Sequence, residues 1–103
     1  YNNAHSVAIK LQNSHQFTFE ESNLQIFGYL LLEQNKGLQS LEVFKLNTRF
    51  FPGSPKTFYD LGEAYSQLKY YQQAITSYQQ VFKNNPSYEA FVKDKIEALQ
   101  GKI

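Results

Sequence analysis

The sequence predicts an all-α fold: two helix–turn–helix hairpins, an N-terminal helix before them and a C-terminal capping helix after them, stacked as a short α-solenoid. Three observations predict it. Apolar residues recur at helical spacing along most of the chain. Proline and glycine interrupt this spacing at regular points. The whole pattern also repeats after 34 residues, a length typical of helical repeats.

The stretch from Pro55 to Tyr88 carries the pattern most clearly. Its first helix has apolar residues at i, i+3 and i+7 on one face: Phe58, Leu61 and Tyr65. Gly62 lies beside them, and because glycine inside a helix costs about 1 kcal/mol relative to alanine, we expect another helix to cross closely there. A polar turn around Lys69 precedes the second helix, whose apolar positions are Ala74, Ile75, Tyr78, Val81 and Phe82. Pro86 follows that helix and predicts its end.

The same pattern occurs 34 residues earlier in the chain. Glycine, proline and aromatic or apolar positions correspond in pairs: Gly28 with Gly62, Pro52 with Pro86, Phe44 with Tyr78, Phe27 with Leu61, and Leu24 with Phe58. These residues resemble the tetratricopeptide repeat (TPR), a 34-residue helix–turn–helix unit. The first unit departs from the family pattern at three positions: Leu31 replaces an aromatic residue, and Ser40 and Asn47 replace small apolar residues.

We expect an N-terminal helix and connector over residues 1–18 and a TPR domain over residues 19–103, with repeats at 21–54 and 55–88 and a capping helix at 88–100. Thr18 and Glu21 form a capping box that starts a helix over 19–34. The partner helix of this first repeat runs from Leu38 to about Phe51. Ser54 is a suitable N-cap with Pro55 at the first helical position, and Ser87 a suitable cap for the last helix, which ends near Gln100.

The first helix of repeat 21–54 is apolar nearly all round, which is typical of a helix buried on more than one side. Its additional apolar residues are Ile26, Tyr29, Leu30 and Leu32, whereas the corresponding positions of the second repeat are Asp60, Glu63, Ala64 and Ser66. We therefore expect something to cover the first repeat that does not cover the second. The N-terminal helix is one candidate, and a neighbouring domain or a second copy of the chain is the other.

Composition limits the class of function. A chain of 103 residues with 42% hydrophobic residues suits one small domain. A net charge of +1 predicts no nucleic-acid partner, and no apolar run reaches the roughly 18 residues that a membrane span needs. The absence of cysteine excludes disulfides and thiolate sites but leaves the compartment open. Since the chain begins at Tyr1 and not at methionine, we expect it to be a fragment of a longer protein, with a processed mature chain as the alternative.

No pattern for catalysis or metal binding is present. His5 and His15 lack a third ligand at any recognisable spacing. Ser54 and Ser66 have no neighbouring base and no nucleophile-elbow pattern. Asp60 and Glu63 share a helical face, and we expect that face to be solvated. The sequence predicts no enzyme activity in this chain, no cofactor and no metal.

The resemblance implies a concave groove lined by the first helix of each repeat, which in TPR proteins holds peptides. The groove residues that it implies are Gln25, Tyr29, Leu32, Glu33, Lys56, Tyr59, Glu63, Ser66 and Gln67, with Lys93 and Glu97 of the last helix as an extension. Intramolecular packing is the alternative role for Tyr29, Leu32 and Tyr59. The lysines and asparagines with which some TPR domains grip acidic chaperone tails are absent, because their positions hold Gln25, Tyr29, Tyr59 and Glu63. Such tails are therefore not expected as partners.

The expected function is non-catalytic protein–protein interaction or domain packing. The expected partner is a protein or peptide, or an upstream domain of the same chain. Assembly into a homo-oligomer is a further alternative. A second resemblance concerns context. The runs Phe17–Leu24, Gly28–Leu31, Phe44–Asn47, Phe51–Ser54 and Tyr59–Tyr65 resemble the C-terminal TPR extension of bacterial serine hydrolases of the beta-lactamase-like or esterase-like kind. It implies an accessory domain that contributes to oligomerisation or substrate access, in a periplasmic or secreted protein.

Overall fold

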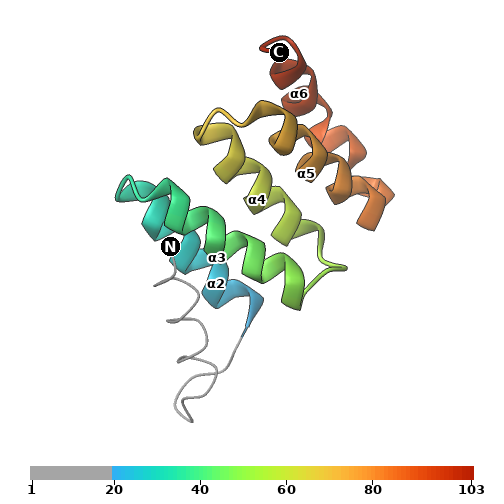
Figure 1. Ribbon diagram of the computed structural model, residues 1–103. Helices are drawn as coiled ribbons and strands as arrows, with labels where there is room; N and C mark the ends of the chain where they lie inside the picture. The colour runs from blue at the N-terminus through green and yellow to red at the C-terminus, as the bar shows by residue number, and fades with distance from the viewer. Residues whose placement is uncertain (1–19) are drawn as a thin grey trace.

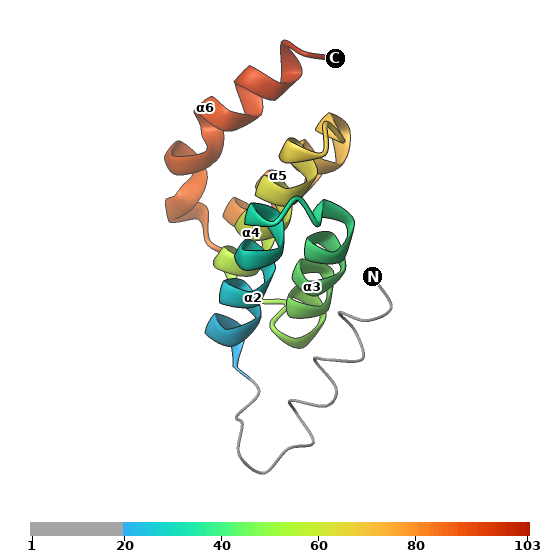
Figure 2. The same cartoon turned by 90° about the vertical axis from the view of Figure 1, so that its left-hand side faces the viewer.

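The computed structural model describes residues 20–103, in which helices follow one another without any strand. Each helix packs mainly against the next one along the chain, and α2 also contacts α4. Figure 1 shows the helices stacked in sequence order, and in Figure 2 α2, α4 and α6 lie toward one side with α3 and α5 toward the other. The predicted all-α short solenoid is thus confirmed. Its elements are α2 (Glu21–Glu33), α3 (Gly37–Phe50), α4 (Pro55–Gln67), α5 (Tyr71–Asn84), the 3-10 helix η1 (Pro86–Tyr88) and α6 (Glu89–Gln100).

The hairpins α2–α3 and α4–α5 turn in the same way. Asn35 and Lys69, which are 34 positions apart, both have positive φ angles, of 59° and 66°. A left-handed residue of this kind commonly ends a helix, because it lets the next N–H reach back to a carbonyl of the last turn. That bond forms in both hairpins: Lys36 N–H to the Leu31 carbonyl and Tyr70 N–H to the Tyr65 carbonyl, each at 2.9 Å. The 34-residue repetition therefore extends to the backbone.

Gly28 and Gly62 lie where the two helices of each hairpin cross. A Cβ atom on Gly62 would come within 2.7 Å of the Tyr78 ring, and one on Gly28 would overlap the Phe44 ring in the same manner. Both rings are almost completely buried. The close crossing predicted from the glycine register is therefore confirmed at both positions.

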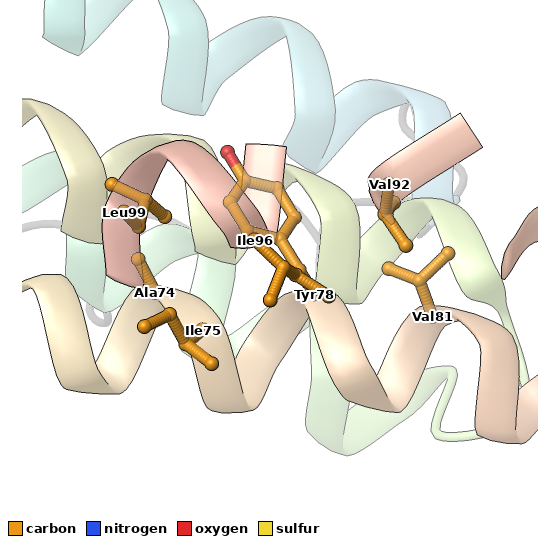
Figure 3. Packing of buried hydrophobic residues seen from close by; sticks show 7 residues of the cluster. All are labelled: Ala74, Ile75, Tyr78, Val81, Val92, Ile96 and Leu99. Carbon is orange, nitrogen blue, oxygen red and sulfur yellow. The ribbon is translucent and has the colours of Figure 1, made fainter. Parts of the chain in front are cut away.

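The apolar core consists of three clusters along the solenoid. One joins α2 to α3 and a second joins α2 and α3 to α4. The third joins α5 to α6, and Figure 3 shows its side chains pointing from both helices toward one another. Its buried members are Ala74, Ile75, Tyr78, Val81, Val92, Ile96 and Leu99. The last helix thus covers the apolar face of α5, as expected of a capping helix.

The helix ends differ in detail from the prediction. α2 begins at Glu21 and not at residue 19, and α3 runs from Gly37 to Phe50, one residue earlier at each end than predicted. Pro55 is the first residue of α4 as predicted, but the side chain of Ser54 makes no capping bond and donates instead to the Glu21 carboxylate at 2.7 Å. Thr18, the N-terminal helix, and His5 and His15 lie outside the described residues.

The start of the last helix is also different. η1 precedes α6, and the cap of η1 is Asn85, whose side-chain oxygen accepts from the backbone N–H of Ser87 at 3.1 Å. The N-cap position of α6 itself is Tyr88, which makes no side-chain capping bond. Ser87 was the expected cap. It lies inside η1 and donates its hydroxyl to the same Asn85 oxygen. Asn85 fits the role because its backbone is extended and its amide oxygen is short enough to fold back onto the next turn.

The polar substitutions in the first repeat have a structural role. Ser40 is buried between α2 and α3, and its hydroxyl donates to the Gly28 carbonyl at 2.8 Å. Asn47 is also buried, and its Nδ2 donates to the Glu21 carbonyl at 3.1 Å. The corresponding residues of the second repeat are Ala74 and Val81, which pack in the apolar cluster against α6. The α2–α3 interface is therefore held by side-chain hydrogen bonds that the α4–α5 interface lacks at these positions.

The apolar residues of α2 do not all need cover from outside the hairpins. Leu32 is buried against α3 and α4. The Tyr29 ring is half-buried, and its centroid lies 5.0 Å from that of the Phe44 ring in an edge-to-face arrangement. The expectation of cover from outside the two hairpins was wrong for Leu32 and Tyr29. α3 and α4 already pack against them, and the contact with α4 cannot be seen in the sequence pattern of the first hairpin alone. Ile26 and Leu30 are exposed, by 59% and 48%.

Candidate binding groove

A cavity of about 260 Å³ opens between α2, α4 and the start of α6. α2 contributes Gln25 and Tyr29 one turn apart, α4 contributes its first two turns, and η1 and α6 contribute aromatic side chains. The groove exists because α2, α4 and α6 lie next to one another along one side of the solenoid. Its full lining is Gln25, Tyr29, Pro55, Lys56, Tyr59, Asp60, Val81, Tyr88 and Phe91.

Asp60 is the buried polar group of the groove. Its side chain is 2% exposed, and Oδ1 accepts from the Tyr29 hydroxyl at 2.6 Å and from Gln25 Nε2 at 3.4 Å. Its other oxygen, Oδ2, is buried without a hydrogen-bond partner in the described part of the chain. Burial raises the pKa of this carboxyl to about 6, and the negative charges of Glu21 and Glu63 act in the same direction, whereas the two hydrogen bonds oppose them.

The burial of Asp60 corrects the expectation that this face of α4 is solvated. α2 of the preceding hairpin lies over that face and brings Tyr29 and Gln25 onto the carboxylate. Burial, and the hydrogen bond that it donates to the Asp60 carboxylate, raise the pKa of the Tyr29 hydroxyl. Ile26, which occupies the position of Asp60 in the first repeat, is exposed. Burial at this position therefore depends on the neighbouring hairpin and not on the residue type.

Aromatic rings form one wall of the groove. The centroid of the Phe91 ring lies 5.3 Å from that of Tyr59 and 6.2 Å from that of Tyr88. Tyr59 also lies 5.7 Å from the buried ring of Tyr78. These separations are within the range in which aromatic pairs attract one another beyond simple burial. Phe91 remains 59% exposed, so the wall presents an open aromatic face to a ligand.

An ion pair ties α4 to α6 beside this wall. Lys95 Nζ lies 2.9 Å from a carboxylate oxygen of Glu63 and 5.5 Å from the centroid of the Tyr59 ring. The bond to Glu63 raises the pKa of the Lys95 ammonium. Burial and the Glu63 carboxylate raise the pKa of the Tyr59 hydroxyl. The pair therefore links α6 to α4 and places a positive charge beside Glu63.

A second hollow of about 510 Å³ continues from the groove toward the start of α2. Gln25, Pro55, Lys56 and Tyr88 line both. The second hollow adds two carboxylates, from Glu20 and Glu21. The groove therefore has a negatively charged end with one exposed lysine side chain at its rim.

The structure brings together only some of the residues predicted for the groove. Gln25, Tyr29, Lys56 and Tyr59 line the cavity, and Glu63 lies next to it in the pair with Lys95. Leu32 is not available to a ligand, because it is buried in the cluster with Leu41, Phe44, Leu61 and Ala64. Glu33, Ser66 and Gln67 lie outside the cavity lining, nearer the hairpin turns.

The extension predicted on the last helix is wrong in register. Lys93 and Glu97 line a different hollow, which α6 forms with Gln79 and Phe82 of α5. Phe91 lines the groove instead, and Lys95 lies beside it in the pair with Glu63. The sequence contained a signal for this face, because Phe91 and Lys95 are four residues apart and so lie on the same side of a helix. Asp60 and Tyr88 were also missed as groove residues.

Residues 20–103 contain no cluster of metal ligands and no helix suited to span a membrane. No three side chains among His, Cys, Asp and Glu in that range lie close enough to hold a metal ion. None of the helices there combines the length and the apolar character that a membrane span requires.

Comparison with known proteins supports the repeat assignment. Residues 55–88 match the family model described as tetratricopeptide repeat, which is the range predicted for the second repeat. Comparisons with curated proteins and with solved structures found no match. Residues 55–88, which form α4, α5 and η1, are therefore similar to a TPR unit, and the α2–α3 hairpin repeats their glycine–aromatic contact and their turn.

Proposed function

We propose that this chain is a non-catalytic interaction module that holds a segment of a protein partner in the groove between α2, α4 and α6. TPR units generally mediate protein–protein interaction, and residues 55–88 match such a unit. The observation that carries the proposal is the aromatic wall. Phe91 is exposed at a cavity that it lines together with Tyr59 and Tyr88, whose rings it contacts, and this arrangement offers apolar contact area to a partner.

The groove supports binding better than catalysis. Its buried carboxylate, Asp60, is hydrogen-bonded to Tyr29 and Gln25 and not to a nucleophile. The remaining lining is aromatic, apolar or amide, with Lys56 at the rim. These groups can hold and orient a ligand through ring contacts and hydrogen bonds.

A selection experiment tests the proposal. The full chain is used to select peptides from a displayed random library, and the selected peptides are then tested on two variants. Phe91→Ala should weaken binding at least tenfold, because an exposed aromatic contact residue at the centre of an interface commonly contributes more than 1.4 kcal/mol. Phe50→Ala removes an exposed phenylalanine of α3 and should leave binding unchanged. Equal binding by the two variants, or a failed selection, would contradict the proposal.

The hydrolase context stays a prediction that rests on the second resemblance. In that reading the same groove would receive a segment of an upstream catalytic domain in place of a separate protein. Reading the codons that precede Tyr1 tests it, because an upstream Ser-x-x-Lys or Gly-x-Ser-x-Gly pattern is expected. Absence of any hydrolase pattern there would remove this alternative and leave the interaction module untouched.

A further inference from the structure

We propose that the groove recognises a basic side chain, with the ammonium or guanidinium group of a partner lysine or arginine held against the aromatic rings and Asp60 as its counter-charge. This inference rests on the proposed function and names the chemistry of the partner segment. Three features of the described residues carry it: the incomplete pairing of Asp60, the aromatic wall, and the size and charge of the cavity.

The first feature is a buried carboxylate with an unused oxygen. Burial of a charge is costly unless opposite charge or hydrogen bonds compensate it. Asp60 Oδ1 has two uncharged donors, whereas Oδ2 has none. Ion pairs within residues 20–103 join Lys45 to Glu42 and Lys95 to Glu63, and none includes Asp60. A cation from a partner would supply the missing opposite charge.

The second feature is the set of rings around the same cavity. Tyr29, Tyr59, Tyr88 and Phe91 all line it. The faces of aromatic rings carry partial negative charge and attract ammonium and guanidinium groups within about 6 Å of the ring centre. Lys95 already uses this attraction on Tyr59, at 5.5 Å from its centroid. Phe91 and Tyr88 remain for a cation that comes from outside.

The third feature is the fit of volume and charge. The cavity holds about 260 Å³, which is below the roughly 300–1,000 Å³ typical of small-molecule sites and suits one long side chain. Glu20 and Glu21 line the adjoining hollow, so a peptide that continues along the groove meets further negative charge. An acidic side chain would meet the Asp60 carboxylate and be repelled. Lys56 also lines the cavity, but its side chain is exposed to solvent, which screens its charge. The buried Asp60 and the two glutamates therefore favour lysine or arginine.

The experiment compares side chains that differ in charge. The full chain, labelled with ¹⁵N, is titrated with acetylated and amidated tripeptides Ala-Xaa-Ala in which Xaa is lysine, arginine, norleucine or glutamate. The lysine and arginine peptides should shift the amide resonances around Asp60 and Phe91, with dissociation constants about tenfold lower than that of the norleucine peptide. Norleucine is the control for the aliphatic part of lysine.

Variants test the role of each feature. Asp60→Asn keeps the shape and the acceptor for Tyr29, and it should abolish the preference for lysine over norleucine. Glu97→Gln makes the same change in net charge on the outer side of α6 and should keep the preference. Phe91→Leu should weaken the lysine peptide severalfold, and because Phe91 is exposed this variant should fold even if Asp60→Asn does not.

Equal affinity for the lysine and norleucine peptides would show an apolar cavity and overturn the inference, while the proposed function would stand. Tighter binding of the glutamate peptide would overturn it in the same way. Absence of any shift with all four peptides would also overturn it. The proposed function would fall only if the library selection yielded no binder, or if the selected peptides bound the Phe91→Ala and Phe50→Ala variants equally.

Discussion

Substitution of Gly62 by alanine should destabilise the chain, although alanine is the better helix former. The new Cβ would lie 2.7, 2.9 and 3.0 Å from three atoms of the Tyr78 ring. Tyr78 is 1% exposed and is held in the cluster with α6, so the ring has no free space to move into. We assign about 2–3 kcal/mol to this overpacking. Helix propensity returns about 1 kcal/mol, which leaves a net loss of about 1–2 kcal/mol.

Urea unfolding followed by circular dichroism measures this loss. Gly53→Ala is the matched control, because a Cβ at Gly53 meets no atom within 4 Å and its φ angle is not positive. The control should change the free energy of unfolding by less than about 0.5 kcal/mol. The melting temperature of Gly62→Ala should fall by about 4–16 °C for a domain of this size. A midpoint for Gly62→Ala equal to or above that of the parent chain would refute the crossing argument.

Three further outcomes can be checked by the same unfolding measurements. The pKa of Asp60 is about 6 in the folded chain against an ordinary 3.8, so the folded state binds this proton more readily than the unfolded state. The stability of the parent chain relative to Asp60→Asn should therefore rise by on the order of 2 kcal/mol as the pH falls from 7 to 4. A difference in stability that stays constant over this pH range would contradict the burial of Asp60. Ser40→Ala should lower the free energy of unfolding by less than about 1 kcal/mol, because the Gly28 carbonyl, which accepts from the Ser40 hydroxyl, still lies within the backbone hydrogen bonding of α2. A loss above about 2 kcal/mol would show that the hydroxyl is essential. Lys69→Gly should stabilise by about 0.5–1 kcal/mol, because Lys69 has a φ of 66°; Asn35→Gly, at the same place in the other hairpin, should gain less, and a destabilised Lys69→Gly would contradict the strain.

The repeat itself could be predicted from the sequence because its signals are local. Gly62 and Tyr78 contact one another within one hairpin, and their spacing recurs as Gly28 and Phe44. The turn at Lys69 could likewise be placed from polarity alone. The helix ends were less accurate, because several residues near each end can act as a cap and the competition between them depends on contacts. Ser54, for example, bonds to Glu21 of another helix.

The groove could be predicted only in part, because its side chains come from helices that are distant in the sequence. Asp60 looks solvated on an isolated helix, and it becomes buried only when α2 lies beside α4. The prediction of Leu32 as a groove residue was wrong because the same contact between α2 and α4 buries its side chain. The side of α6 that lies at the groove was predicted wrongly, because the sequence allows both Lys93 and Lys95 on a solvent-exposed face. Only the contact of Lys95 with Glu63 shows which of the two lies near the groove.

The different interfaces of the two hairpins have a consequence for the order of folding. Most contacts join helices that follow one another along the chain. Only short loops must therefore close for these contacts to form, and fast folding is expected. Where the α2–α3 hairpin has the directed hydrogen bonds of Ser40 and Asn47, the second hairpin has the apolar residues Ala74 and Val81. We expect α4–α5 to form in the transition state and α2–α3 to dock afterwards. Gly62→Ala would then slow refolding in stopped-flow experiments, whereas Gly28→Ala would mainly accelerate unfolding, and the reverse pattern would place nucleation in the first hairpin.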